Sequence, residues 1–146
     1  MRLRSLIFLL VAVAPPLRAQ TAADSAAIRA TAMDYMMGWY TGDTVRMGRA
    51  LHPELAKRIV NTDSTGASRL SHMGADRLIE GTRRGYGKET PADQRTADAR
   101  ILDIFGNTAS VRGTMRNWID YMHMAKWNGR WVIVNVLWEM KPGERN

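Results

Sequence analysis

The chain has 146 residues, a formal net charge of +7 at neutral pH and no cysteine. This length suits one ordinary domain, and the lack of cysteine excludes disulfides and thiolate metal sites. Basic residues are spread along the chain without a block of lysine and arginine interleaved with aromatics, which argues against nucleic-acid binding.

Residues 1–19 have the order of a secretory signal peptide. Arg2 and Arg4 precede an apolar run over residues 6–14, two prolines follow, and Ala19 offers a small residue for cleavage. The run is short for a transmembrane helix, which disfavours a stable membrane anchor. Cleavage after Ala19 would remove three arginines and leave 127 residues of net charge +4. We therefore expect residues 20–146 to form one exported domain, periplasmic or extracellular.

The mature chain is predicted to open with a helix over residues 21–40, capped by Asp24 or Ser25. Its apolar positions recur at helical spacing: Ile28, Ala32, Tyr35, Met36 and Trp39. Tyr35 and Trp39 lie one turn apart. They are expected to pack against a sheet, and a cone-shaped interior would let them contact a ligand as well.

Two shorter helices are expected next. Asp43 would cap the first, over residues 44–51, and residues 55–62 are expected to be extended or irregular. Ser71 would cap the second, over residues 71–84. The apolar side of this third helix is predicted to contain Leu70, Met73, Gly74, Leu78 and Gly81.

The pattern then changes from helices to strands. Residues 85–95 are a polar loop, long enough to act as a rim or lid. Residues 97–105 and 108–116 flank Gly106-Asn107 and predict a hairpin. Its apolar face is expected to contain Leu102, Ile104, Ala109, Val111 and Met115.

Residues 118–140 predict a second hairpin, closed by a type I′ turn at Asn128-Gly129. Counting from the turn pairs Asp120 with Leu137 and Met122 with Asn135. The same face would contain Trp118, Met124, Trp131 and Ile133, and the other face Tyr121, His123, Val132, Val134, Val136 and Trp138. Both faces are mostly apolar. We expect helices to cover one and a second copy of the chain to cover the other, as a homodimer.

Helices followed by a four-stranded antiparallel meander predict an α+β fold. The element order resembles the nuclear transport factor 2-like superfamily, and within it the putative lumazine-binding family. The stretches that carry the resemblance are Ala50–Leu55 followed by Lys57-Arg58, Asp120–Lys126, and Gly129–Asn135. The resemblance implies a cone-shaped domain with about three N-terminal helices packed on a curved antiparallel sheet, and it also favours the homodimer. Enzymes of the superfamily place a carboxylate or histidine in the cone, usually with a tyrosine or aspartate donor.

Asp120 is the first candidate for acid/base chemistry. A carboxylate among apolar side chains is expected to have a raised proton affinity, and Asn135 lies diagonally across on the same predicted face. The alternative is structural, with Asp120 accepting a hydrogen bond from a helix-end amide or from His52. His52 is the second candidate: it could point into the cone mouth or bond the last carbonyls of its helix.

We therefore expect a small apolar or aromatic molecule to bind in the cone. The expected ligand-binding residues are Tyr35, Trp39, His52, Trp118, Asp120, Met122, Trp131 and Asn135. No cofactor is expected, and three histidines without ligand spacing predict no metal site. Two alternatives stay open. One is an isomerase, dehydratase or cyclase that uses Asp120 or His52, and the other is a dimerising module whose cone is filled by its own side chains.

Overall fold

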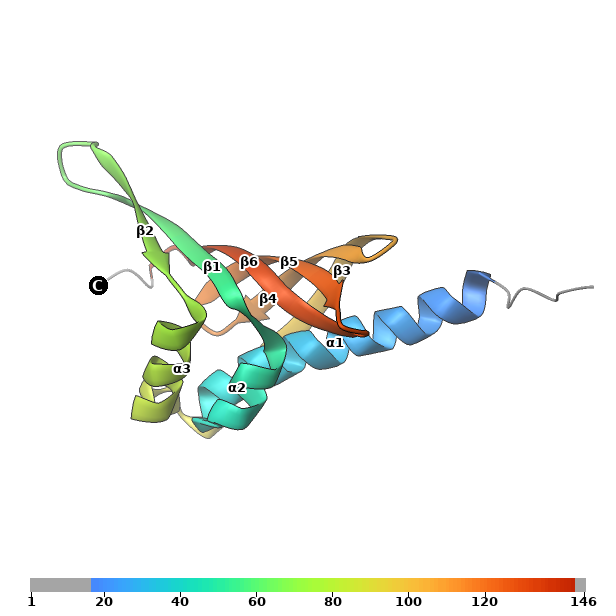
Figure 1. The fold of residues 1–146 in the computed structure, drawn as a ribbon. Helices are drawn as coiled ribbons and strands as arrows, with labels where there is room; N and C mark the ends of the chain where they lie inside the picture. Colours follow the sequence, from blue (N-terminus) through green and yellow to red (C-terminus); the bar gives the residue numbers. More distant parts are fainter. Residues whose placement is uncertain (1–16, 144–146) are drawn as a thin grey trace, which may run out of the picture.

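The computed structural model describes residues 17–143, and it places three helices on one side of a six-stranded sheet (Figure 1). The helices are α1 (Leu17–Thr41), α2 (Thr44–Ala50) and α3 (Ala75–Arg84), and the 3-10 turns Tyr86–Glu89 and Ala92–Gln94 follow α3. The strands are β1 (Leu51–Thr62), β2 (Ser68–Met73), β3 (Ala97–Phe105), β4 (Thr108–Met115), β5 (Trp118–Trp127) and β6 (Arg130–Met140). The α+β class is confirmed, but the sheet has six strands rather than the predicted four.

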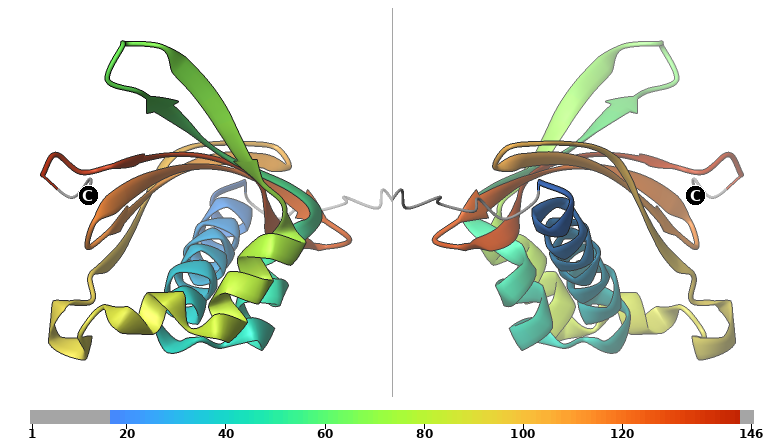
Figure 2. Two further views of the ribbon diagram at one scale, coloured as in Figure 1. Left: turned by 90° about the vertical axis from the view of Figure 1, so that its left-hand side faces the viewer. Right: turned by 90° about the vertical axis from the view of Figure 1, so that its right-hand side faces the viewer.

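The strand order is β2-β1-β6-β5-β4-β3. Neighbouring strands are antiparallel except β1 and β6, which run parallel. The sheet curves over α1, and the β1–β2 hairpin extends beyond the other strands (Figures 1 and 2). The core fills the concave side, where buried residues of α1 meet Met115, Met122, Met124 and Ile133 of the sheet.

Most of the predicted signal segment lies outside the described residues. Its last three residues, 17–19, form the beginning of α1. Within the described part of the chain, no helix has the length and apolar character needed to cross a membrane. Whether the segment is cleaved stays a prediction.

Helix α1 begins earlier than predicted, so Asp24 and Ser25 lie inside it and neither caps its start. The Asp24 carboxylate accepts hydrogen bonds from Lys126 Nζ and Trp131 Nε1, both at 2.9 Å. Because Lys126 and Trp131 stand next to the β5–β6 turn, these bonds attach that end of the hairpin to α1.

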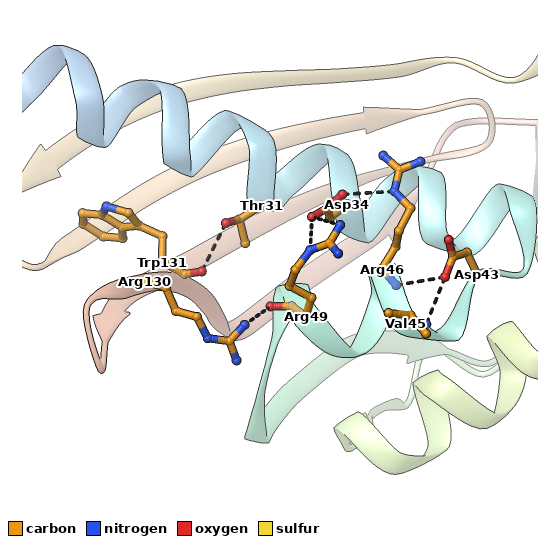
Figure 3. A network of polar contacts seen from close by, with 8 residues as sticks. All are labelled: Thr31, Asp34, Asp43, Val45, Arg46, Arg49, Arg130 and Trp131. Carbon is orange, nitrogen blue, oxygen red and sulfur yellow. Dashed lines mark hydrogen bonds and ion pairs between the residues drawn. The ribbon is translucent and has the colours of Figure 1, made fainter.

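Helix α2 begins after Asp43, as predicted. Asp43 Oδ1 accepts hydrogen bonds from two backbone N–H groups of the first turn, each at 3.0 Å (Figure 3). A second carboxylate, Asp34 of α1, accepts from Arg46 Nε at 3.0 Å and Arg49 Nε at 2.8 Å, which fixes α2 against α1 (Figure 3). The helix ends at Ala50, one residue earlier than predicted, because the next residue starts β1.

Residues 68–73 form a strand, so the helix predicted to start at Ser71 is wrong at its beginning. Asp63 Oδ1 accepts from two backbone N–H groups of the turn that follows it, and this turn returns the chain alongside β1. Pairing with β1 commits these residues to a ladder, and α3 begins only at Ala75. Leu70 is therefore 59% exposed instead of facing the core.

The β5–β6 hairpin has the predicted turn, since φ is +48° at Asn128 and +79° at Gly129. The predicted pairing holds from the turn as far as Met124 opposite Ile133. A β-bulge follows, because Val134 has no residue opposite it.

Beyond the bulge the predicted register of β6 is wrong by one residue. Asp120 lies opposite Trp138 instead of Leu137, and Asn135 lies opposite His123. Since side chains alternate along a strand, a shift of one residue exchanges the two faces. Trp138 therefore lies on the concave face with Asp120, and Asn135 lies on the convex face.

A second bulge, in β3, makes the predicted face of one β3 residue wrong for the same reason. Ile101 pairs with Val111 and Asp103 with Ser110, so Leu102 is the extra residue. Leu102 is 49% exposed, although it was expected on the apolar face. The other predicted members of that face pack in or against the core.

Candidate functional site

A cavity of about 150 Å³ lies between α1, α3 and the concave face of the sheet. It is bounded by side chains from two helices and four strands, and nearly all of its wall is apolar. The lining residues are Tyr35, Trp39, Lys57, Met73, Leu78, Trp118, Trp138 and Met140. This is the space in which the sequence predicted a ligand.

Three tryptophans form a continuous aromatic wall around the cavity. Trp39 and Trp118 meet edge to face, with ring centroids 6.4 Å apart, and Trp118 meets Trp138 in the same manner at 6.2 Å. Gly87 supports Trp39 from behind: a Cβ at Gly87 would lie within 2.2 Å of the Trp39 carbonyl oxygen. Only glycine allows the backbone to approach Trp39 so closely.

A buried polar cluster lies at one side of this wall. Lys57 Nζ donates to Asp120 Oδ1 at 2.5 Å and to the Tyr35 hydroxyl at 2.6 Å. The Tyr35 hydroxyl donates to Asp120 Oδ2 at 3.2 Å, and Trp118 Nε1 donates to the same oxygen at 3.0 Å. Lys57 Nζ also lies 4.8 Å from the centroid of the Trp138 ring, within cation–π range.

The cluster is internally neutral and almost completely buried. Lys57 is 6% exposed and Asp120 is inaccessible to solvent. Burial lowers the pKa of the Lys57 ammonium below its ordinary value, and the charge and hydrogen bond of Asp120 oppose that shift. Burial and the Asp120 charge together raise the pKa of Tyr35 well above its usual range. Among the described residues, no buried side-chain nitrogen or oxygen lacks a hydrogen-bond partner.

The structure brings together some of the predicted site residues and separates others. Tyr35, Trp39 and Trp118 line the cavity, whereas Asp120 lies behind Lys57 and does not reach its wall. Met122 and Trp131 are buried in the core outside the cavity. The structural alternative predicted that Asp120 accepts a hydrogen bond from a helix-end amide or from His52. In the structure its donors are instead Lys57, Tyr35 and Trp118.

His52 and Asn135 lie away from the cavity. His52 belongs to β1 rather than to a helix end; its Nδ1 accepts from the Glu54 N–H at 3.1 Å, and its ring packs on Trp127. Asn135, on the convex face, accepts from Arg58 Nη1 at 2.9 Å. Neither residue supports Asp120, which corrects the predicted pairing of Asp120 with Asn135 and the predicted contact with His52.

No group of three or more histidine, aspartate or glutamate side chains in residues 17–143 is arranged to hold a metal ion. The polar groups that face the cavity are an ammonium and a phenol. Such a pair donates hydrogen bonds and exchanges protons, and it does not ligate metals while protonated.

The sequence profile described as putative lumazine-binding matches residues 23–139. The chain belongs to this family. The matched part includes every residue that lines the cavity except Met140, so the site belongs to the shared domain. No curated protein matches the chain.

Solved structures similar to this member of the putative lumazine-binding family support its fold. A nuclear transport factor 2-like protein of unknown function from Shewanella baltica is 18% identical, with a TM-score of 0.66, over 89% of this chain and 100% of the other. One with a cystatin-like fold from Novosphingobium aromaticivorans is 14% identical, with a TM-score of 0.63, over 86% and 87%. At these identities the likeness shows the nuclear transport factor 2-like fold alone.

Sequence reasoning missed the residues of this family member that matter most at the cavity, Lys57 and Trp138. Leu55 and Lys57 are two residues apart in a strand, so their side chains lie on the same face. Because Leu55 is buried, this alternation was the available signal that Lys57 also faces the interior. No comparable signal marked Trp138, because its face depends on the bulge at Val134. Met73 and Met140 lie at strand ends, where the pattern is weak.

Proposed function

We propose that this protein binds a small, neutral aromatic molecule in the cavity beside Lys57. The observation that supports this function is an aromatic wall of three tryptophans next to one buried ion pair whose charges cancel. Apolar pockets with a few fixed polar groups are the usual form of small-molecule sites. The cavity also argues against the alternative of a cone filled by its own side chains.

Size and charge limit the occupant. A cavity of about 150 Å³ accepts roughly one six-membered ring, so a bicyclic molecule such as lumazine would extend beyond it. The Lys57 charge is already balanced by Asp120, so a second anion would be buried without its own cation. A neutral molecule with one hydrogen-bond acceptor meets both limits, because an ammonium has three donors and only two are used here.

Calorimetric titration with benzyl alcohol tests this proposal. The full-length or mature protein should bind it with a one-to-one stoichiometry, and Met73→Trp should abolish binding because the indole occupies the cavity edge. Leu70→Trp is the matched control, since Leu70 is exposed on the same strand and does not line the cavity. Equal binding by both variants would reject the cavity as the site. Mass spectrometry of molecules that co-purify with the protein would identify a natural ligand.

Acid/base catalysis remains the second candidate function. Asp120 is already bound by three donors and does not line the cavity, so proton exchange with a ligand would pass through Tyr35 or Lys57. Asp120→Asn would abolish turnover by a catalyst, whereas it would change only the affinity of a binder.

We also propose export and homodimerisation, as the sequence suggests. Export is supported by the signal-like pattern of residues 1–19. The apolar patch expected at the dimer interface differs from the predicted one, because Val136 and Trp138 turn inward. The large apolar side chains that stay exposed on β5 and β6 are Tyr121 (47%), Trp127 (50%) and Leu137 (49%). Sedimentation at micromolar concentration that shows only monomer would reject the dimer.

A further inference from the structure

Lys57 differs from the other lysines of the chain in its surroundings. The chain has four, Lys57, Lys88, Lys126 and Lys141, and Lys57 is the one that is buried. It is also the one that lines the aromatic cavity. Its amine therefore meets the contents of the cavity rather than bulk water.

We propose that Lys57 captures the carbonyl group of a small aromatic aldehyde or ketone as an imine inside this cavity. The inference rests on the proposed ligand site and extends it from binding to covalent capture. Lysine amines that form imines are unprotonated when they attack and lie in desolvated pockets. Lys57 meets the second condition by burial, and the lowered pKa that burial causes favours the first.

The bonds and protons of the step balance within the cluster. The Lys57 ammonium first passes one proton to Asp120, and the amine lone pair then forms a bond to the carbonyl carbon while the C=O π electrons move to oxygen. The proton held by Asp120 and one further proton from the nitrogen reach that oxygen, which leaves as water when the nitrogen lone pair forms the C=N bond. The nitrogen keeps one proton, so the product is an iminium ion.

The hydrogen bonds in the cluster provide the route for these protons. Tyr35 stands between the other two groups, with its hydroxyl 2.6 Å from Lys57 Nζ and 3.2 Å from Asp120 Oδ2. It can therefore accept from one side and donate to the other. The raised pKa of Tyr35 keeps its proton on the phenol, so the hydroxyl acts as a donor to a developing alkoxide.

The same arrangement stabilises the product. The iminium has the charge of the ammonium it replaces and lies against Asp120 Oδ1, so the buried charge remains balanced. Burial restricts the access of water, which would hydrolyse the imine. The aromatic ring of the captured molecule would lie among Trp118 and Trp138, which fits a single ring better than an aliphatic chain.

Reductive trapping with benzaldehyde and cyanoborohydride tests the proposal on the intact protein. Reduction converts the imine to a stable benzyl amine, and peptide mass mapping assigns it to a lysine. We expect the benzyl group on Lys57 ahead of exposed Lys88, with loss of tryptic cleavage after Lys57. Excess benzyl alcohol, which fills the cavity but cannot form an imine, should protect Lys57 and leave Lys88 unaffected.

Two variants complete the experiment. Lys57→Arg keeps the positive charge beside Asp120 and should abolish cavity labelling, and Lys88→Arg should leave labelling of Lys57 unchanged. If Lys57→Arg does not fold, protection by benzyl alcohol in the wild-type protein decides the question alone. Labelling of Lys57 that benzyl alcohol does not reduce would overturn the proposal.

The outcomes also separate this inference from the ligand-binding proposal. If benzyl alcohol binds by calorimetry but Lys57 stays unlabelled while Lys88 reacts, imine formation is wrong and the binding site stands. If benzyl alcohol neither binds nor protects and Lys57 stays unlabelled, both proposals are wrong.

Discussion

Lys57 and Asp120 form an ion pair across an intervening strand: their atoms Nζ and Oδ1 are 2.5 Å apart, although β6 separates β1 from β5 in the sheet. The lysine therefore reaches over β6 on the concave face, and Tyr35 of α1 closes the arrangement from the helical layer. One polar cluster thus joins two strands and a helix at the wall of the cavity.

Removal of one member of this pair should destabilise the fold strongly. Lys57→Met leaves the Asp120 carboxylate buried without a cation, and we expect a loss of about 3–5 kcal/mol in the free energy of unfolding. Urea denaturation followed by far-UV circular dichroism measures it. The double variant Lys57→Met with Asp120→Asn should recover much of the loss, because no buried charge remains. Losses that simply add would show that the two residues are not coupled.

Tyr35 should ionise only at strongly alkaline pH. Its folded pKa is raised above the ordinary 10.0, so the unfolded chain loses this proton first. The resulting stability is complete below pH 10 and is lost as pH rises toward the folded pKa. The melting temperature should therefore fall more steeply across this range for the wild type than for Tyr35→Phe, which lacks the hydroxyl that ionises. Parallel curves would contradict the shift.

Gly87→Ala should disturb the aromatic wall. The new methyl group would lie 2.2 Å from the carbonyl oxygen of Trp39, a backbone atom that cannot move aside without shifting α1. We expect a loss of about 1–3 kcal/mol and a change in the near-UV circular dichroism of the tryptophans.

Gly48→Ala is the matched control for that substitution. Gly48 lies in α2, and a Cβ there would meet only Ile79 at 3.8 Å, an ordinary contact. Alanine should stabilise the helix by up to about 1 kcal/mol. Equal losses in both variants would show that the close approach of Gly87 to Trp39 is not the cause.

Asp24 should contribute to stability at neutral pH but not in acid. The hydrogen bond from Lys126 first, and that from Trp131 second, lower the pKa of this carboxyl below 3.8. A lowered folded pKa gives stability that is present above pH 3.8 and is lost as pH falls through the folded value. Melting temperatures of wild type and Asp24→Asn should differ at neutral pH and converge in acid. Asp93→Asn, at an exposed carboxylate, should follow the wild type throughout.

Local signals in the sequence predicted the β3–β4 and β5–β6 turns, the Asp43 cap and the order of the three helices correctly. They missed β2, because residues 68–73 form a strand only through their pairing with β1. The sequence also failed where a single bulged residue changed the register. Nothing in the composition around Val134 marks it as the bulged residue, because a bulge depends on the twist and neighbours of the whole sheet. Without that information, Trp138 could not be predicted to line the cavity.

Lys57 shows a different limit of the sequence. A charged residue in a strand is ordinarily assigned to solvent, because burying an unpaired ammonium is costly. The compensating groups are Asp120 and Tyr35, which lie 63 and 22 residues away in the chain. Only the tertiary structure brings them within hydrogen-bond distance.

The bulge at Val134 makes the chemistry of the cavity depend on the length of β6 as well as on its residues. One residue more between the bulge and Leu137 would place Leu137 opposite Asp120 and turn Trp138 to the convex face, with no side chain replaced. Lys57 would then lose the Trp138 ring while keeping the Asp120 carboxylate and Tyr35. An insertion or deletion in this part of the strand therefore changes the side chains that face the cavity as much as several substitutions would. Relatives of equal composition can for this reason have different pockets.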